Sequence, residues 1–226
     1  MDLENPTIIK NVLTKDEIRQ LLDWWHIEQL KGSFAEASIA WSYITWPIRQ
    51  EHEAYHIICN AITKHIVGHD NWEWIGSRIN KQEKPGVKIH KDDAHAEDNP
   101  QNERYTIIMN LSSNYRGSTV VFNQTHYGNY HFDYWHYLSN KQQGKGEKGE
   151  EVNDLEDGFV ISEKDYNKHL RHIPKKKLEG LSIKKVVDWR SPGDASYFRS
   201  NNLHSPGYSE EGNWKIAAAT LIKIYK

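Results

Sequence analysis

Cysteine is nearly absent: Cys59 is the only one in a chain of 226 residues. A single cysteine excludes an internal disulfide and a cysteine-based zinc cluster, and it is typical of a reducing compartment. No stretch approaches the ~20 consecutive apolar residues of a membrane span. Residues 1–6 show no basic region followed by an apolar run, as a secretory signal would. We therefore expect a cytoplasmic protein with no membrane partner.

A charge bias is absent as well. The chain has 29 Lys and Arg against 31 Asp and Glu, a formal net charge of −2. Nucleic-acid binding usually leaves a basic face, so we expect no nucleic-acid partner. Aromatic residues are abundant, with 9 Trp and 12 Tyr, which predicts a core and any cleft rich in rings. The length suits one domain, and the oligomeric state stays open.

The first part of the chain predicts two helices. Thr14 and Glu17 form a capping-box pattern ahead of apolar residues at helical spacing. A second apolar stripe covers residues 49–67, after the pair Trp46-Pro47, and Gly68 is a plausible end for it.

From residue 72 onward the chain reads as short strands. We predict strands at 72–80, 87–92, 104–111, 118–122, 182–189, 195–199 and 215–225, with a corner at 201–205. Helices followed by strands indicate an α+β fold with a β-sandwich or barrel core. Residues 123–189 interrupt this rhythm, and we interpret them as an insertion in a single domain spanning residues 1–226. Its aromatic stretch, 127–137, predicts either a lid or binding wall, or the insertion's own small core.

Two His-x-Asp pairs are present, His90 with Asp92 and His131 with Asp133. Alternate strand residues share a face, so either pair offers two ligands to a divalent transition metal. About 0.7 such pairs are expected by chance, so the context decides. His90 and Asp92 end a short apolar strand after a Pro-Gly turn, and metal ligands need rigid elements. We predict this pair as ligands, with His204 as the third.

Five motifs in order carry a resemblance to a known family. They are Pro-Gly-x(3)-His-x-Asp ending at Asp92, Arg-x-Thr starting at Arg104, Gly-x-Thr-x-x-Phe ending at Phe122, Pro-Gly-Asp-Ala-x-x-Phe-x(5)-His ending at His204, and the basic residue Lys215 at the start of the last strand. Over roughly residues 72–122 and 186–225 the chain resembles the 2-oxoglutarate/Fe(II)-dependent dioxygenases, and most of all their prolyl 4-hydroxylase-like branch.

The resemblance implies a double-stranded β-helix, which is a cupin-like jelly-roll barrel, with N-terminal supporting helices and a long insertion. It implies that His90, Asp92 and His204 are the catalytic facial triad for Fe(II). The cosubstrates would be 2-oxoglutarate and O2, with ascorbate as an optional reductant. Oxidative decarboxylation of 2-oxoglutarate to succinate and CO2 would be coupled to hydroxylation of an unactivated C–H bond.

The same resemblance assigns the cosubstrate contacts. Lys215 would bind the distal carboxylate of 2-oxoglutarate. It lies eleven residues after His204, about one more than is usual, so Trp214 could face inward in its place. Many relatives use a tyrosine where this chain has residues 80–82, Asn-Lys-Gln. Asn110 is a further candidate contact, although an asparagine here also suits a strand-end turn.

The substrate is left open by the sequence. We expect hydroxylation of a peptidyl residue such as proline, in a peptide or protein partner. One alternative is the same chemistry on a free amino acid or small metabolite. Another is a non-catalytic jelly-roll binding module whose metal is lost or structural, and the intact His-x-Asp…His set argues against it.

Overall fold

The computed structural model describes residues 5–32, 36–38, 43–82, 88–92, 103–112, 117–127, 132–143, 151–189, 191–209 and 215–225. Its strands are β1 (Thr7–Ile9), β2 (Glu36–Ser38), β3 (Tyr43–Ile48), β4 (Trp72–Gln82), β5 (Glu103–Asn110), β6 (Gly117–Tyr127), β7 (Glu151–Asn153), β8 (Ile183–Trp189), β9 (Ala195–Arg199), β10 (Asn202–Pro206) and β11 (Lys215–Ile224). Its α-helices are α1 (Lys15–Leu30), α2 (Glu53–Ile62), α3 (Tyr134–Gln142) and α4 (Glu163–Asp165). The predicted α+β class is confirmed.

The strands form two antiparallel sheets. The larger has the order β1-β9-β5-β11-β4-β3-β2. In the smaller, β6 pairs with β10 along one edge and with β8 and β7 along the other. The segment 88–92 joins the smaller sheet through an isolated antiparallel bridge between His90 and His204. Strands far apart in sequence therefore lie side by side, and this brings the candidate ligands together.

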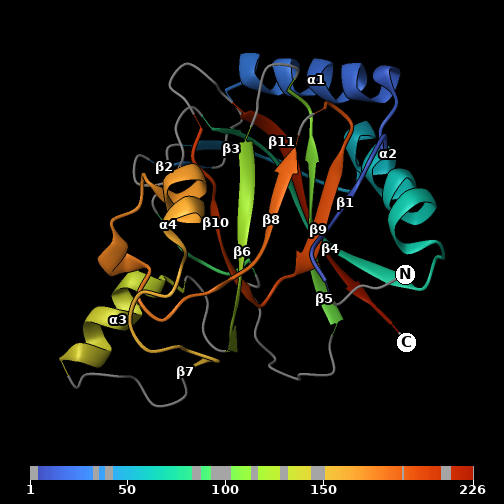
Figure 1. Cartoon of the computed structure of the whole chain (residues 1–226). Coiled ribbons are helices and arrows are strands. Elements are labelled where there is room, and N and C mark those ends of the chain that lie inside the picture. Colours follow the sequence, from blue (N-terminus) through green and yellow to red (C-terminus); the bar gives the residue numbers. More distant parts are fainter. Residues whose placement is uncertain are drawn as a thin grey trace.

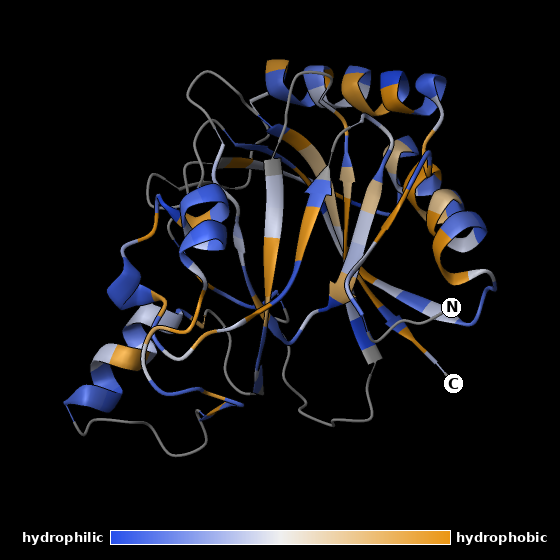
Figure 2. Cartoon of the chain, viewed as in Figure 1, coloured by the Kyte–Doolittle hydropathy of each residue, from blue (hydrophilic) through white to orange (hydrophobic). Residues whose placement is uncertain are grey.

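Helices α1 and α2 cover one face of the larger sheet (Figure 1). Thr14 caps α1 in the predicted capping box with Glu17, and α2 is amphipathic (Figure 2). One core cluster joins Trp25 of α1 and Ile58 of α2 to alternate residues of the sheet strands, such as Ile107. All helices within the described ranges fall short of the length or apolar content that crossing a membrane requires.

The other face of the larger sheet meets the smaller sheet. A second core cluster joins Ile108, Phe198 and Ala217 of the larger sheet to Val121 and Val187 of the smaller one. Successive strand residues point to opposite faces. Residues an even number of positions from Ile108 on β5, or from Ala217 on β11, are in step with them and thus point into the space between the sheets. We call this side of each sheet the inner face.

The expected insertion begins and ends within the smaller sheet, because residues 123–127 belong to β6 and 183–189 to β8. The described part between these strands has its own core against the outer face of that sheet, built around residues such as Phe122, Leu170 and Leu181. Phe132 and Tyr134 of the aromatic stretch are buried in it. These two rings therefore pack in that core, and the interpretation of residues 123–189 as an insertion stays a prediction. Helices α3 and α4 lie on the side opposite α1 and α2 (Figure 1).

Four local predictions need correction. Trp46 and Pro47 lie in β3 rather than leading into a helix. Among the described residues, β2 pairs only with residues 43–45 of β3, so Pro47 lies beyond that pairing, where a missing N–H is tolerated. The second helix starts at Glu53, and its final turn, Thr63–Val67, is π-helical before Gly68. The corner at 201–205 is strand β10, stabilised by pairing with β6. Within 88–92 only the bridge of His90 to His204 is strand-like.

Candidate metal centre

Backbone hydrogen bonds hold the segment with His90 and Asp92 against strand β10. The amide of His90 donates to the carbonyl of His204 at 3.0 Å, and the amide of His204 donates back to His90 at 2.9 Å. The amide of Asp92 donates to the carbonyl of Ser200 at 3.2 Å. These bonds fix three side chains from two distant parts of the sequence on one side of the sheet.

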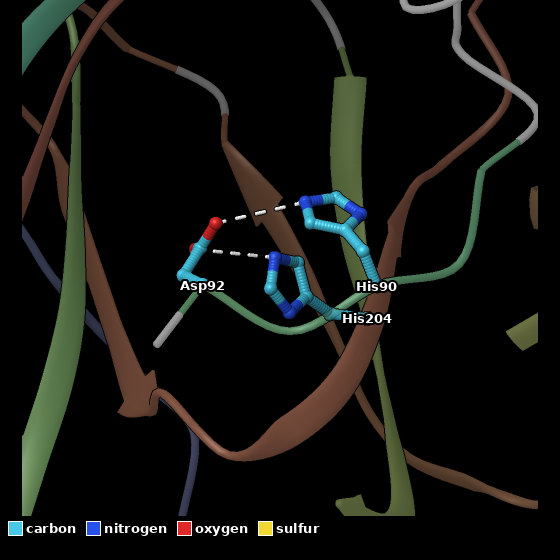
Figure 3. Close-up of side chains that lie close together, drawn as sticks. All are labelled: His90, Asp92 and His204. Atoms are coloured by element: carbon cyan, nitrogen blue, oxygen red, sulfur yellow. Dashed lines mark ion pairs between the residues drawn. The ribbon is translucent and has the colours of Figure 1, made fainter. Parts of the chain in front are cut away.

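The three predicted ligands converge. Their ligand atoms all lie within 4.8 Å of one another. Nε2 of His204 is 3.2 Å from Oδ2 of Asp92, and Nε2 of His90 is 3.6 Å from Oδ1 (Figure 3). The side chains are only 4%, 16% and 14% exposed for His204, His90 and Asp92. The result is a compact, nearly buried set of two imidazoles and one carboxylate.

The His204 ring is oriented by its surroundings. Its Nδ1 lies 3.1 Å from the carbonyl oxygen of Asn202, so Nδ1 carries the proton and donates. Nε2, which faces Asp92, is then the nitrogen left to bind a metal, and it can do so once it gives up the proton that it shares with Asp92 in the metal-free protein. The ring of Phe198 packs 4.8 Å from that of His204 between their centroids, which adds an apolar wall.

Burial and mutual charge shift the pKa values of these groups. Burial raises the pKa of Asp92, but the charge of His204 and hydrogen bonds from both histidines outweigh it, and the pKa ends well below its ordinary value. Burial, reinforced by the charge of His204, lowers the pKa of His90. A carboxylate and a neutral imidazole are the protonation states that bind a metal.

Lys215 points toward the inner face. It is in step with Ala217, which belongs to the core cluster between the sheets. The competing residue, Trp214, lies outside the described residues. Burial lowers the pKa of Lys215 to about 7, and the negative charge of Asp92 opposes that shift. A buried lysine that feels the charge of the triad's carboxylate is suitably placed to attract an anion into the same space.

The side-chain amide of Asn110 forms hydrogen bonds at the end of β5. Its Oδ1 accepts hydrogen bonds from the amide and hydroxyl of Ser112, both at 3.2 Å. Its Nδ2 donates to the carbonyls of Ser112 at 3.2 Å and Ser191 at 3.1 Å. These four bonds occupy both N–H donors and both lone pairs of the side-chain amide, so Asn110 stabilises the turn at the strand end. This role agrees with the strand-end turn given as the alternative, and a contact of Asn110 with the cosubstrate stays a prediction.

Sequence reasoning missed two hydroxyl groups on the inner face. Thr106 and Ser196 are in step with Ile108 and Phe198, and both residues are buried. Within the described part of the chain, neither hydroxyl oxygen has a hydrogen-bond partner. Buried polar groups normally have partners, so these two indicate a polar ligand between the sheets. The strand alternation around Thr106 was the available signal.

Of the second His-x-Asp pair the structure describes only Asp133, and this residue has a structural role. Oδ1 of Asp133 accepts from the amides of Trp135 at 3.0 Å and His136 at 3.4 Å, and so caps α3. Its Oδ2 lies 3.6 Å from Nζ of Lys88. His131 is outside the described residues. An aspartate at an N-cap position needs no metal to explain it.

No protein-family model matches this sequence, and no curated protein matches it. Solved structures do match this chain. The matching structures belong to the class of 2-oxoglutarate- and iron-dependent oxygenases, and prolyl hydroxylases are among them. The sequence identities are low, so the comparison shows a shared fold. The resemblance drawn from the five motifs is confirmed at that level.

Three of these structures illustrate the likeness. The non-heme alpha-ketoglutarate-dependent epimerase SnoN from nogalamycin biosynthesis has a TM-score of 0.54 at 12% identity, covering 98% of this chain and 79% of its own. A Pseudomonas putida prolyl-4-hydroxylase has a TM-score of 0.52 at 10% identity, covering 99% and 94%. The prolyl hydroxylase from Trichoplax adhaerens, in complex with a peptide of hypoxia inducible factor, has 0.51 at 13%, covering 98% and 84%.

Proposed function

We propose that this protein is an Fe(II)- and 2-oxoglutarate-dependent oxygenase that hydroxylates an unactivated C–H bond. The observation that carries the proposal is the convergence of His90, Asp92 and His204, with ligand atoms within 4.8 Å. Two imidazoles and one carboxylate with open positions are typical of non-heme Fe(II) oxygenases. The likeness in fold to oxygenases of that class supports it. The two facing sheets would close as a double-stranded β-helix, in one domain with an insertion.

The chain's own residues would divide the work. His90 and His204 would bind the metal through Nε2, and Asp92 through one carboxylate oxygen. When bound, Fe(II) supplies the activation of O2 that the chemistry requires. The hydrogen bond from Nδ1 of His204 to Asn202 holds the ring in its binding tautomer. The surrounding burial limits access of water to the reacting atoms.

The 2-oxo acid would enter between the sheets. Lys215 would pair with its distal carboxylate, because its buried side chain lies on the inner face and feels the charge of Asp92. The hydroxyl groups of Thr106 and Ser196, which face the same space without partners among the described residues, are candidates for its remaining polar contacts. In this assignment the metal ligands and the cation come from different sheets, with the cosubstrate spanning the distance.

A peptidyl residue such as proline is the favoured substrate. The support is the likeness to two prolyl hydroxylases, one of them bound to a peptide. A small molecule is the second candidate, because the TM-score with SnoN, an epimerase of nogalamycin biosynthesis, is comparable. A binding module without catalysis is disfavoured by the complete ligand set.

Substrate-independent turnover tests the proposal. Purified protein with Fe(II), O2 and 2-oxoglutarate should release succinate slowly, and His90→Ala should abolish the release. A screen of proline-containing peptides and free amino acids for a mass gain of one oxygen would then separate the two substrate classes. Absence of succinate from metal-loaded wild-type protein would refute the enzyme assignment.

A further inference from the structure

Arg78 lies next to the metal centre, and the proposed function assigns it no role. On β4 its neighbour Ile79 points into the helix-covered core, so Arg78 points to the inner face. Its Nη2 is 3.8 Å from Oδ1 of Asp92, and 46% of its side chain is exposed. A half-exposed guanidinium at that distance makes only a weak ion pair. Among the described residues, it therefore remains available to a second anion.

The strand neighbours of Arg78 are short side chains, and further positive side chains lie along the same face. Its partner across the strand pair is the small residue Ala219, which is incompletely buried. Farther along the same face, Arg104 and Lys223 stand directly opposite each other in the register of β5 and β11. Glu73, opposite Lys223 on β4, offsets part of this positive charge.

The sum of charges in a site that holds Fe(II) and 2-oxoglutarate also favours an anionic substrate. A divalent metal, the carboxylate of Asp92 and two neutral imidazoles leave one positive charge. The 2-oxo acid dianion and the ammonium of Lys215 then bring the sum to neutrality. Arg78 adds a positive charge to this neutral set, and an anionic group of the substrate would bring the sum back to neutrality.

We propose that Arg78 binds an anionic group of the substrate, so that the substrates of this protein carry a carboxylate close to the oxidised carbon. This inference rests on the proposed function and specifies the substrate class of the same site. Arginine suits the role because its planar fork binds a carboxylate through two parallel hydrogen bonds. The carboxylate can belong to a free amino acid, to a small acid or to an acidic side chain of a peptide.

Paired acids and amides test this inference. The full-length protein, loaded anaerobically with Fe(II) and 2-oxoglutarate, is titrated by calorimetry with N-acetyl-proline, N-acetyl-glutamate and their carboxamides. We expect an acid to bind at least about tenfold more tightly than its amide, as a charge-assisted pair implies. Arg78→Gln should remove that preference and Arg78→Lys should retain part of it. Lys81→Gln is the matched control, because Lys81 is on the same strand but is in step with Ile79.

Each outcome decides the question. Equal affinities of acid and amide, or no binding of either in the wild type, would overturn the inference without needing any variant to fold. If Arg78→Gln weakens binding of 2-oxoglutarate, the guanidinium contacts the cosubstrate instead. If it weakens only Fe(II) binding, Arg78 positions Asp92. Formation of the Fe(II)–2-oxoglutarate complex in the wild type is checked first, so a failure of the proposed function is recognised separately.

Discussion

At the scale of single residues, the two His-x-Asp pairs show how the same short motif can have different roles. Asp92 faces two imidazoles, whereas Asp133 caps a helix. We predict that Asp92→Asn abolishes tight Fe(II) binding, because the amide is neutral and a poor metal ligand. Asp133→Asn, the matched change, should leave Fe(II) binding intact, since asparagine also caps helices. Equilibrium dialysis with metal analysis would measure both, and equal losses would contradict the assignment.

Lys215 predicts a pH dependence of cosubstrate binding. Its pKa of about 7 means that the free protein carries mostly neutral lysine at pH 8, whereas the dianion binds the charged form. Binding at pH 8 should therefore take up close to one proton, and affinity should fall as pH rises above 7. Calorimetry in buffers of different ionisation enthalpy measures the uptake.

Two variants complete that experiment. Lys215→Arg should bind 2-oxoglutarate without proton uptake, because arginine stays charged. Lys215→Ala should weaken 2-oxoglutarate binding by about tenfold or more, while Fe(II) binding persists. If Lys215→Ala changes neither, Lys215 is not the cosubstrate cation.

At the scale of elements, the turn between β8 and β9 predicts a measurable strain. Gly193 has φ 87°, and a Cβ there would approach the carbonyl oxygen of Leu13 to 2.6 Å. Its own carbonyl accepts the amides of Val12 and Leu13. Gly193→Ala should lower the free energy of unfolding by about 3 kcal/mol or more, which combines strain and clash.

Gly158 is the matched control for this turn. It has φ 74° with nothing within 4 Å of a Cβ, so Gly158→Ala should cost only about 1 kcal/mol from backbone strain. Urea unfolding of both variants gives the comparison. Equal costs would show that the contact with Leu13 does not constrain the turn.

The sequence could predict elements whose signals are local. The capping box of Thr14 and Glu17 and the closing strand at Lys215 were predictable, because capping and alternation act between near neighbours. Strand β10 was mistaken for a corner, since Asn201 and Asn202 have turn propensity and its pairing with β6 is long-range. Pro47 obscured strand β3 for the same reason, because only the strand pairing shows that it lies beyond the described residues of β2.

The site residues also differ in whether their signals are local in the sequence. His90, Asp92 and His204 were predictable because they lie in ordered motifs. The hydrogen bonds of Asn110 to Ser112 and Ser191 could not be predicted, because they depend on a turn between strands far apart in sequence. Arg78 had no local signal at all, because its significance comes from its distance to Asp92.

At the scale of the whole molecule, the insertion's core makes the protein sensitive to acid. His126 is fully buried, stacks on Phe132 with centroids 3.7 Å apart, and has no hydrogen-bond partner for either ring nitrogen among the described residues. Burial, with a smaller contribution from the charge of Lys91, lowers the pKa of His126 to about 4. The unfolded chain, with a pKa near 6.5, then binds more protons between these values.

Stability should therefore fall as pH drops from about 6.5 to 4, with a contribution from His126 of about 3 kcal/mol. His126→Phe should flatten this part of the profile, because phenylalanine can stack on Phe132 without a titrating group. His136→Gln, at an exposed position of α3, is the control. Urea unfolding at several pH values gives the profiles, and an unchanged slope in His126→Phe would contradict this account.

The two helices and the insertion cover opposite sides of the paired sheets, so the ligand-bearing inner face is supported from both directions. The central claim is that His90, Asp92 and His204 form an Fe(II) site that also binds 2-oxoglutarate. Its most direct test is an anaerobic titration of the protein with Fe(II) and 2-oxoglutarate, followed by visible absorption. We predict a weak charge-transfer band that saturates at one equivalent of Fe(II) and is absent from His90→Ala and His204→Ala. If wild-type protein gives no band, or the variants retain it, the account of this site is wrong.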